Sequence, residues 1–242
     1  MKPILEGVKI LDLTRVMAGP WCTQTLADMG AAVYKVERPV TGDDMRHVPP
    51  IHAFGGREDR KVSTGYVGLN RGKRSLAIDI SNAEGQRLVR ELARTCDVFV
   101  ENFKAGDLAR YGLAYEHLRE VNPALIYCSI TGYGQTGPMA SHPGYDPVFQ
   151  AISGMMSTCG SPDGEPMRTT IPYVDVMGGM TATTAVLGAL LHRRATGEGQ
   201  FIDIAMMDVA LGATASYGQA YLCAGKLPER RGNGSQLFAP SS

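Results

Sequence analysis

Short apolar runs alternate with amphipathic stretches along the first half of the chain. The runs predict five strands, at residues 8–13, 32–36, 75–79, 97–100 and 125–130. Pro20 lies in the first turn of a predicted helix that continues to Met29, and a second predicted helix, over residues 82–95, has its apolar residues on one face. The alternation predicts an α/β fold: a Rossmann-like open, mostly parallel sheet with flanking helices.

The second half of the chain contains longer helical stretches and more turns. Helical segments are predicted near residue 107 and over 117–121, 151–160, 175–194 and 207–223, and one further strand over 201–205. Residues 40–68 are rich in Gly, Pro, His and charge and are predicted to form a long loop. The segment 176–191 is apolar but packed with Gly, Ala and Thr, so we expect a helix buried within the protein rather than a membrane span.

Composition limits the partners and the compartment. The 242 residues carry 24 Lys and Arg against 24 Asp and Glu, and 44% are hydrophobic. A net charge of zero provides no electrostatic footprint for nucleic acid or an anionic membrane, so neither is an expected partner. The five cysteines are scattered and odd in number, and the first residues, MKPILEGVKILDLT, contain no signal-peptide pattern. We therefore expect a cytoplasmic protein with reduced thiols.

Searches for common chemical motifs are negative. The sequence has no GxGxxG after the first predicted strand, so the dinucleotide-binding fingerprint is missing, and it has no GxxxxGK[ST], HExxH or GxSxG motif. The five histidines lack the spacing of metal ligands. We expect no metal site and no permanently bound cofactor.

Asp175 has two interpretations. It stands where the predicted helix 175–194 begins, and Asp is a favoured N-cap residue whose carboxylate accepts hydrogen bonds from free backbone amides. Alternatively, it is a carboxylate nucleophile beside a large ligand. Gly178 and Gly179 follow it, and each glycine costs a helix about 1 kcal/mol relative to Ala. The space that they leave serves either a ligand or close helix packing.

Basic residues follow two of the predicted strands. Arg38 comes after the second strand, and Lys104 and Arg110 come after the fourth. Ligands of open α/β sheets bind at the carboxyl ends of the strands. These residues are therefore either solvated loop charges or a clamp for a phosphate-rich ligand.

Several motifs occur together in one order. They are LDLTRVMAGP at 11–20, LADMGAAVYKVERP at 26–39, GDDMR at 42–46, LNRGKRS at 69–75, VENF at 100–103, GYD at 144–146, Asp175, and TGEGQFIDI at 196–204. The combination resembles the class III CoA-transferases, the family of formyl-CoA transferase, carnitine CoA-transferase and the bile-acid-inducible CoA-transferases. The resemblance covers essentially the whole chain.

The resemblance implies a reaction in which Asp175 is the nucleophile. Its carboxylate attacks an acyl-CoA to give an aspartyl anhydride, and the CoA thiolate then forms an aspartyl-CoA thioester from which CoA passes to a free carboxylic acid. The expected partners are thus an acyl-CoA and a carboxylic acid, with coenzyme A as substrate rather than as resident cofactor. Such a scheme keeps the thioester energy in covalent intermediates.

The resemblance also implies a set of CoA contacts. They are Met17, Ala18, Arg38, Ile78, Asp79, Ile80, Ser81, Asn102, Phe103, Lys104, Arg110, Gly144, Tyr145 and Asp146. Two positions depart from formyl-CoA transferase: Met17 replaces a glutamine near the reacting carbonyl, and Ser81 replaces a lysine. From Met17 we expect acyl groups that are larger or less polar than formyl or oxalyl, and from Ser81 we expect one CoA contact to be missing or replaced.

Two other functions remain open at this point. The related α-methylacyl-CoA racemases share the aspartate but use a histidine where this chain has Tyr145, a poor general base near neutral pH; His142 is three residues away. An inactive CoA-binding fragment is the other alternative, because family members are longer. The resemblance implies a large α/β CoA-binding and catalytic domain over residues 1–224, a linker over 225–242 toward a missing small domain, and an interlocked homodimer in the full-length form.

Overall fold

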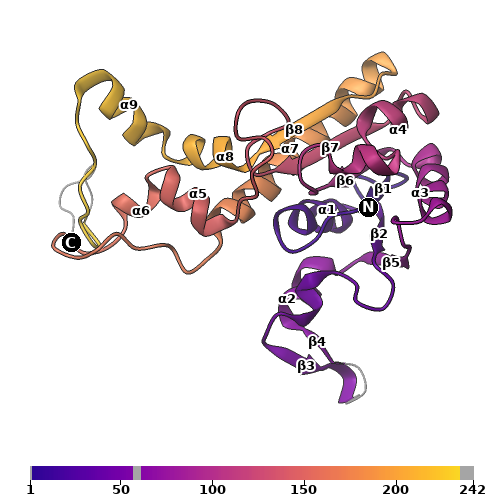
Figure 1. Cartoon of the computed structure of the whole chain (residues 1–242), viewed down its shortest axis with the longest axis horizontal. Coiled ribbons are helices and arrows are strands. Elements are labelled where there is room, and N and C mark those ends of the chain that lie inside the picture. The colour runs from indigo at the N-terminus through magenta and orange to yellow at the C-terminus, as the bar shows by residue number, and fades with distance from the viewer. Residues whose placement is uncertain (1, 57–60, 235–242) are drawn as a thin grey trace.

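The computed structural model describes residues 2–56 and 61–234. Its centre is a six-stranded sheet in the order β5-β2-β1-β6-β7-β8, in which every neighbouring pair is parallel (Figure 1). The strands are β1 Lys9–Asp12, β2 Ala32–Glu37, β5 Lys73–Ala77, β6 Val98–Glu101, β7 Ile126–Thr131 and β8 Phe201–Ala205. Counted along the chain, these six strands have the order 3-2-1-4-5-6 of the Rossmann fold, which confirms the predicted fold class.

The strand order reverses between β1 and β6. The chain leaves β1 toward β2 on one side and leaves β6 toward β7 on the other, so the loops that follow these two strands diverge. β1 and β6 pair with Asp12 opposite Val100. The loop after β1 therefore begins beside the loop after β6, at the crevice where open α/β sheets bind ligands.

Helices cover both faces of the sheet. They are α1 Ala18–Asp28 and α7 Tyr173–Thr196 on one face, and α3 Ala83–Thr95 and α4 Tyr115–Val121 on the other. Successive strand residues point to opposite faces, so Ile10 packs with Val186 of α7 whereas Leu11 packs with Val89 of α3. All four side chains are fully buried.

The segment from 40 to 70 is more ordered than the predicted loop. It contains a 3₁₀ turn η1 Asp44–His47, the strands β3 Ile51–Ala53 and β4 Lys61–Ser63, a 3₁₀ turn η2 Phe54–Gly56, and the helix α2 Thr64–Asn70. β3 and β4 are antiparallel, and the Ser63 side chain caps α2 by accepting from the Gly65 and Tyr66 amides. Figure 1 shows this segment projecting from the sheet. The prediction of a continuous loop is wrong.

Two predicted helices are each split into two. The range 151–160 contains the end of α5 Asp146–Ile152 and the whole of α6 Met155–Thr158, and the range 207–223 contains most of α8 Met206–Ala213 and of α9 Ala215–Ala224. Gly154, with a φ of 81°, separates the first pair, and Thr214 separates the second. The helix predicted near residue 107 is the 3₁₀ turn η3 Asp107–Tyr111.

α7 is the longest helix in the part of the chain that the structure describes. Among these residues it alone has the length and apolar character to cross a membrane, with a mean hydropathy of 1.5. It packs instead against α1, β7, β8 and α8, which buries Val174, Ala182 and Val186. Its other face leaves Met180 and Leu191 exposed. The expectation of a helix packed within the protein therefore holds for one side of α7.

Candidate active site

Asp175 lies in the first turn of α7, at the edge of a cavity of about 310 Å³. Its side chain is partly buried, and this burial raises its pKa to about 7, with a smaller contribution from the neighbouring carboxylate of Asp146. A carboxyl group with such a pKa is half ionised near neutral pH. Perturbed acids of this kind in a cavity are typical of functional sites.

Asp146 supplies the cap that was predicted for Asp175. Its Oδ2 accepts hydrogen bonds from the backbone amides of Val174, at 2.7 Å, and Asp175, at 3.2 Å, while Oδ1 accepts from the Gln150 amide. α7 begins at Tyr173, two residues earlier than predicted, and its N-cap residue Pro172 makes no side-chain cap. The N-cap interpretation of Asp175 is therefore wrong: its carboxylate does not cap α7.

The glycine pair of α7 serves close helix packing. A Cβ at Gly178 would lie 2.4 Å from Met206 Sδ, and a Cβ at Gly179 would lie 2.7 Å from the carbonyl oxygen of Ala18. α7 thus contacts the first residue of α1 directly. Of the two uses considered for this space, helix packing is the one observed, and it brings the N-terminus of α1 next to Asp175.

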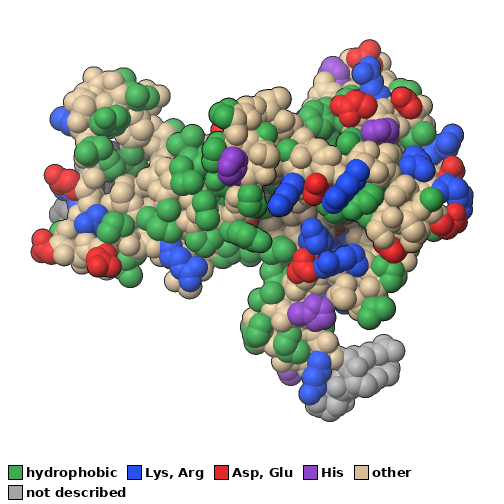
Figure 2. Space-filling model, viewed as in Figure 1, with side chains coloured by type: hydrophobic (Ala, Val, Ile, Leu, Met, Phe, Trp, Pro, Cys, Tyr) green, Lys and Arg blue, Asp and Glu red, His purple; other side chains and the backbone are tan. Residues whose placement is uncertain are grey.

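Three loops at the carboxyl ends of the strands surround the cavity. Its lining comes from the start of α1, the loop after β6 and the loop after β7, and includes Arg15, Met17, Ala18, Asn102, Phe103, Lys104, His142, Gly144, Tyr145 and Asp175. Pro20 has no N–H, and the Trp21 amide donates to the Met17 carbonyl, so the free N–H groups in the first turn of α1 are those of Ala18 and Gly19. Figure 2 shows basic side chains gathered over the middle of the viewed face, with acidic side chains between them.

Asn102 joins the two loops that diverge at the reversal of strand order. Its Oδ1 accepts from the Arg15 amide at 2.9 Å, and its Nδ2 donates to the Arg15 carbonyl at 2.8 Å. The Arg15 guanidinium lies over the Phe103 ring, 5.2 Å from its centroid. These contacts make Arg15 and Phe103 a fixed partition at the crevice.

A second cavity, of about 160 Å³, lies on the other side of that partition. It is lined by Leu13, Arg15, Val36, Glu37, Arg38, Gly42, Asp43, Ile78, Asp79, Ile80, Ser81, Phe103 and Tyr111. Arg15 and Phe103 line both cavities. The two cavities therefore adjoin each other across Arg15 and Phe103, with Asp175 lining one and Arg38 lining the other. Adjoining cavities of this kind suit an elongated ligand with an anionic end.

Residues 5–242 match the family model described as CoA-transferase family III. The chain belongs to this family. It is 47% identical over 239 residues to the succinate–glutarate CoA-transferase of Agrobacterium fabrum, an alignment that covers 99% of this chain, and 45% identical over 240 residues to the succinyl-CoA:glutarate CoA-transferase of Mus musculus. The crystal structure of a CAIB/BAIF family protein from Brucella suis superposes with a TM-score of 0.92, at 45% identity and covering 98% of this chain.

This family III chain spans only part of the length of these relatives. The alignments cover 60% of the Agrobacterium protein, 53% of the mouse protein and 62% of the Brucella chain. The match to the family model confirms, at the level of the family, the resemblance inferred from the sequence motifs.

Most of the residues expected at the CoA site line one of the two cavities. Met17, Ala18, Asn102, Phe103, Lys104, Gly144 and Tyr145 line the first, and Arg38, Ile78, Asp79, Ile80 and Ser81 line the second. Arg110 and Asp146 line neither. Arg110 lies over the ring of Tyr111, 4.8 Å from its centroid, and Tyr111 lines the second cavity. Asp146 is buried beneath the start of α7.

Sequence reasoning gave no role to Arg15, Asp44 or Glu101. Arg15 and Arg38 both pair with the carboxylate of Asp44, which lines the first cavity. Glu101 is buried at the end of β6, and burial raises its pKa to about 7 while it accepts the Phe103 amide at 2.7 Å. All three stand within the quoted motifs, but only their positions after parallel strands could have singled them out.

Proposed function

We propose that the whole protein transfers CoA from an acyl-CoA thioester to a carboxylic acid through covalent intermediates on Asp175. The observation that carries the proposal is the pair of adjoining cavities, one lined by Arg38 and the other by Asp175, with Arg15 and Phe103 between them. CoA is elongated and carries phosphates at one end and its thiol at the other. Arg38 suits the phosphate end, and Asp175 then meets the thioester.

The proposed reaction consists of balanced acyl transfers. An Asp175 oxygen attacks the thioester carbonyl, the carbon–sulfur bond breaks, and CoA leaves as thiolate from a mixed anhydride. The thiolate attacks the Asp175 carbonyl of that anhydride, releasing the donor acid as carboxylate and leaving an aspartyl-CoA thioester. The acceptor carboxylate repeats these steps in reverse and restores the Asp175 carboxylate. In this proposal the N–H groups of Ala18 and Gly19, at the start of α1, stabilise the oxyanion of each tetrahedral step.

We further propose that the acyl groups are dicarboxylic. The relatives named above act, by their names, on succinate or succinyl-CoA and glutarate. The cavity beside Asp175 is lined by Arg15, Lys104 and His142, three side chains that can bind a second carboxylate. This proposal replaces the expectation of less polar acyl groups that was based on Met17 alone. We also propose a homodimer, which the family resemblance implies, and a cytoplasmic location, which the scattered cysteines favour.

The test of the proposed function is CoA transfer by the whole protein with Asp175→Ala and Asp175→Asn. Both variants should lose transfer between succinyl-CoA and glutarate while retaining CoA binding, because neither side chain can form an anhydride. Asp163→Asn, in an exposed turn, is the matched control and should transfer normally. Transfer by Asp175→Ala at the wild-type rate would refute the proposal. Rapid exchange of the α-proton of a 2-methylacyl-CoA without an acceptor acid would favour racemase chemistry instead.

A further inference from the structure

The five residues between β1 and α1, residues 13–17, are held by hydrogen bonds from β1, β2 and the loops that follow β2 and β6. The Thr14 amide donates to Asp12 Oδ1 and the Thr14 carbonyl accepts from Lys35 Nζ, at 2.8 and 2.7 Å. The Val16 amide donates to Asp43 Oδ1 at 3.0 Å. Together with the Asn102 contacts to Arg15, these bonds fix the backbone that leads into the candidate active site.

Val16 needs such support because its backbone is strained. Its φ is 67°, a left-handed conformation that β-branched residues rarely adopt. Val16 also lines the first cavity, and its side chain is 37% exposed, so apolar packing alone does not hold it. Strain of this kind persists where surrounding contacts over-determine the conformation, and it is concentrated at functional sites.

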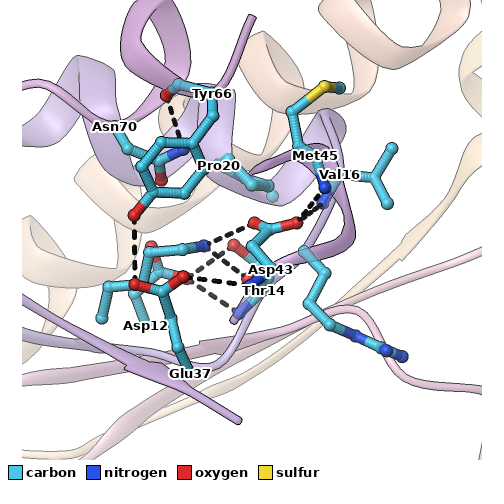
Figure 3. A network of polar contacts seen from close by, with 12 residues as sticks. Asp12, Thr14, Val16, Pro20, Glu37, Asp43, Met45, Tyr66 and Asn70 are labelled. Carbon is cyan, nitrogen blue, oxygen red and sulfur yellow. Dashed lines mark hydrogen bonds and ion pairs between the residues drawn. The ribbon is translucent and has the colours of Figure 1, made fainter. Parts of the chain in front are cut away.

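Asp43 is the main contact that opposes this strain. Its side chain is completely buried, and Oδ1 accepts from both the Val16 and the Met45 amides at 3.0 Å (Figure 3). Its own amide donates to Glu37 Oε1 at 3.0 Å. These bonds fix the carboxylate in one orientation, directed at Val16.

Lys35 neutralises the buried charge of the Asp43 carboxylate. It extends from β2, its side chain is 1% exposed, and its Nζ lies 2.9 Å from Asp43 Oδ2 as an ion pair. A second buried pair, Lys73 and Asp12 at 3.1 Å, lies beside it. A buried charge without its partner is strongly unfavourable, so Lys35 keeps Asp43 in place.

The conformation of Val16 affects the candidate active site because Val16 leads directly into α1. Met17 follows Val16, is the N-cap residue of α1, and accepts a hydrogen bond from the Trp21 amide at 2.8 Å. Ala18 is already in contact with α7 near Asp175. A change in the φ of Val16 would swing Met17 and the first amides of α1 away from Asp175.

We propose that Asp43, held by Lys35, is a positioning residue that keeps Val16 left-handed and so aligns the start of α1 with Asp175. The proposal rests on the proposed CoA transfer for its kinetic consequence, but its structural claim concerns Val16 alone. Asp43 touches no reacting atom in this scheme. Its effect is expected in kcat rather than in KM for the acyl-CoA.

The kinetic test is a rescue experiment in the whole protein. Asp43→Ala should lower kcat about tenfold or more, because small misplacements of reacting groups are costly, with little change in KM. Adding Val16→Gly, which removes the strain, should restore kcat to that of Val16→Gly alone. Val40→Gly is the matched control: Val40 also has a φ of 67°, but it is fully exposed. It should not rescue.

Unchanged kcat in Asp43→Ala would overturn the proposal, as would rescue by Val40→Gly or failure of rescue by Val16→Gly. Crystal structures of wild type and Asp43→Ala provide a readout that needs no activity. Val16 should leave the left-handed region in the variant, and a retained positive φ would refute the claim. If Asp43→Ala does not fold, Asp43→Asn is used in its place, because it keeps an acceptor oxygen. Its kcat should fall by less than the tenfold expected for Asp43→Ala, and adding Val16→Gly should restore it. A loss of kcat that Val16→Gly does not restore would refute the claim. Absence of transfer by wild type would instead count against the proposed function.

Discussion

The carboxylate of Asp146 accepts the backbone amide of Asp175 at 3.2 Å and that of Val174 at 2.7 Å. One acidic residue thus caps the helix that presents another. The bonds leave the Asp175 carboxylate directed toward the cavity, and the negative charge of Asp146 adds to burial in raising the Asp175 pKa to about 7. Asp146 therefore affects both the placement and the ionisation of Asp175.

Asp146→Asn should shift the pH dependence of transfer. The nucleophile must be ionised, so kcat/KM is expected to rise with pH through about 7 in wild type. Removing the Asp146 charge lowers the Asp175 pKa, and the midpoint should move to lower pH. The measurement is kcat/KM from pH 5 to 9, with Asp163→Asn as control. An unchanged or raised midpoint in Asp146→Asn would show that Asp146 does not act on Asp175 through its charge.

Gly179→Ala should destabilise the fold. The new Cβ would lie 2.7 Å from the Ala18 carbonyl oxygen and 2.8 Å from Trp21 Cβ, so α1 and α7 must separate, at a cost of about 1–3 kcal/mol. Gly188→Ala in the same helix meets no atom within 4 Å and should stabilise by up to about 1 kcal/mol. Urea unfolding followed by the fluorescence of Trp21, the only tryptophan, measures both. Equal effects would contradict the packing described for α1 and α7.

The buried carboxyl group of Glu101 should make stability depend on pH. Its pKa is raised from 4.5 to about 7, chiefly by burial, so the folded state binds more protons than the unfolded state between these values. The free energy of unfolding should therefore fall as pH rises across this window, by about 3 kcal/mol for this group. Glu101→Gln should flatten that part of the curve, whereas the exposed Glu116→Gln should not. Parallel curves for wild type and Glu101→Gln would contradict the assignment.

The core strands could be predicted because each buried strand is a short run of apolar residues in the sequence. The strand at 201–205 is found as predicted, and the helix predicted over 82–95 is found as Ala83–Thr95 with Asn82 as its cap. The hairpin of β3 and β4 was missed for the opposite reason. Each strand has only three residues; β3 is mostly exposed, and β4 runs from exposed Lys61 to buried Ser63, so neither has an alternating pattern that marks it as a strand.

The parts of the site that escaped prediction depend on contacts between distant residues. The cap of α7 comes from Asp146, 29 residues before Asp175, whereas local propensity favoured Asp175 itself. Lys35 stands in AVYKVE, where a lysine is expected at the surface, yet it is buried against Asp43. Neither relationship has a signature within a single segment of sequence.

The most direct test of the central claim is chemical trapping of the acylated aspartate. The whole protein is incubated with succinyl-CoA and hydroxylamine, and the modified residue is identified by peptide mass spectrometry. An acyl-CoA-dependent hydroxamate on Asp175, absent when CoA alone is supplied, is the predicted result. CoA transfer that proceeds while Asp175 remains unmodified, or modification confined to another carboxylate such as Glu101, would contradict the account.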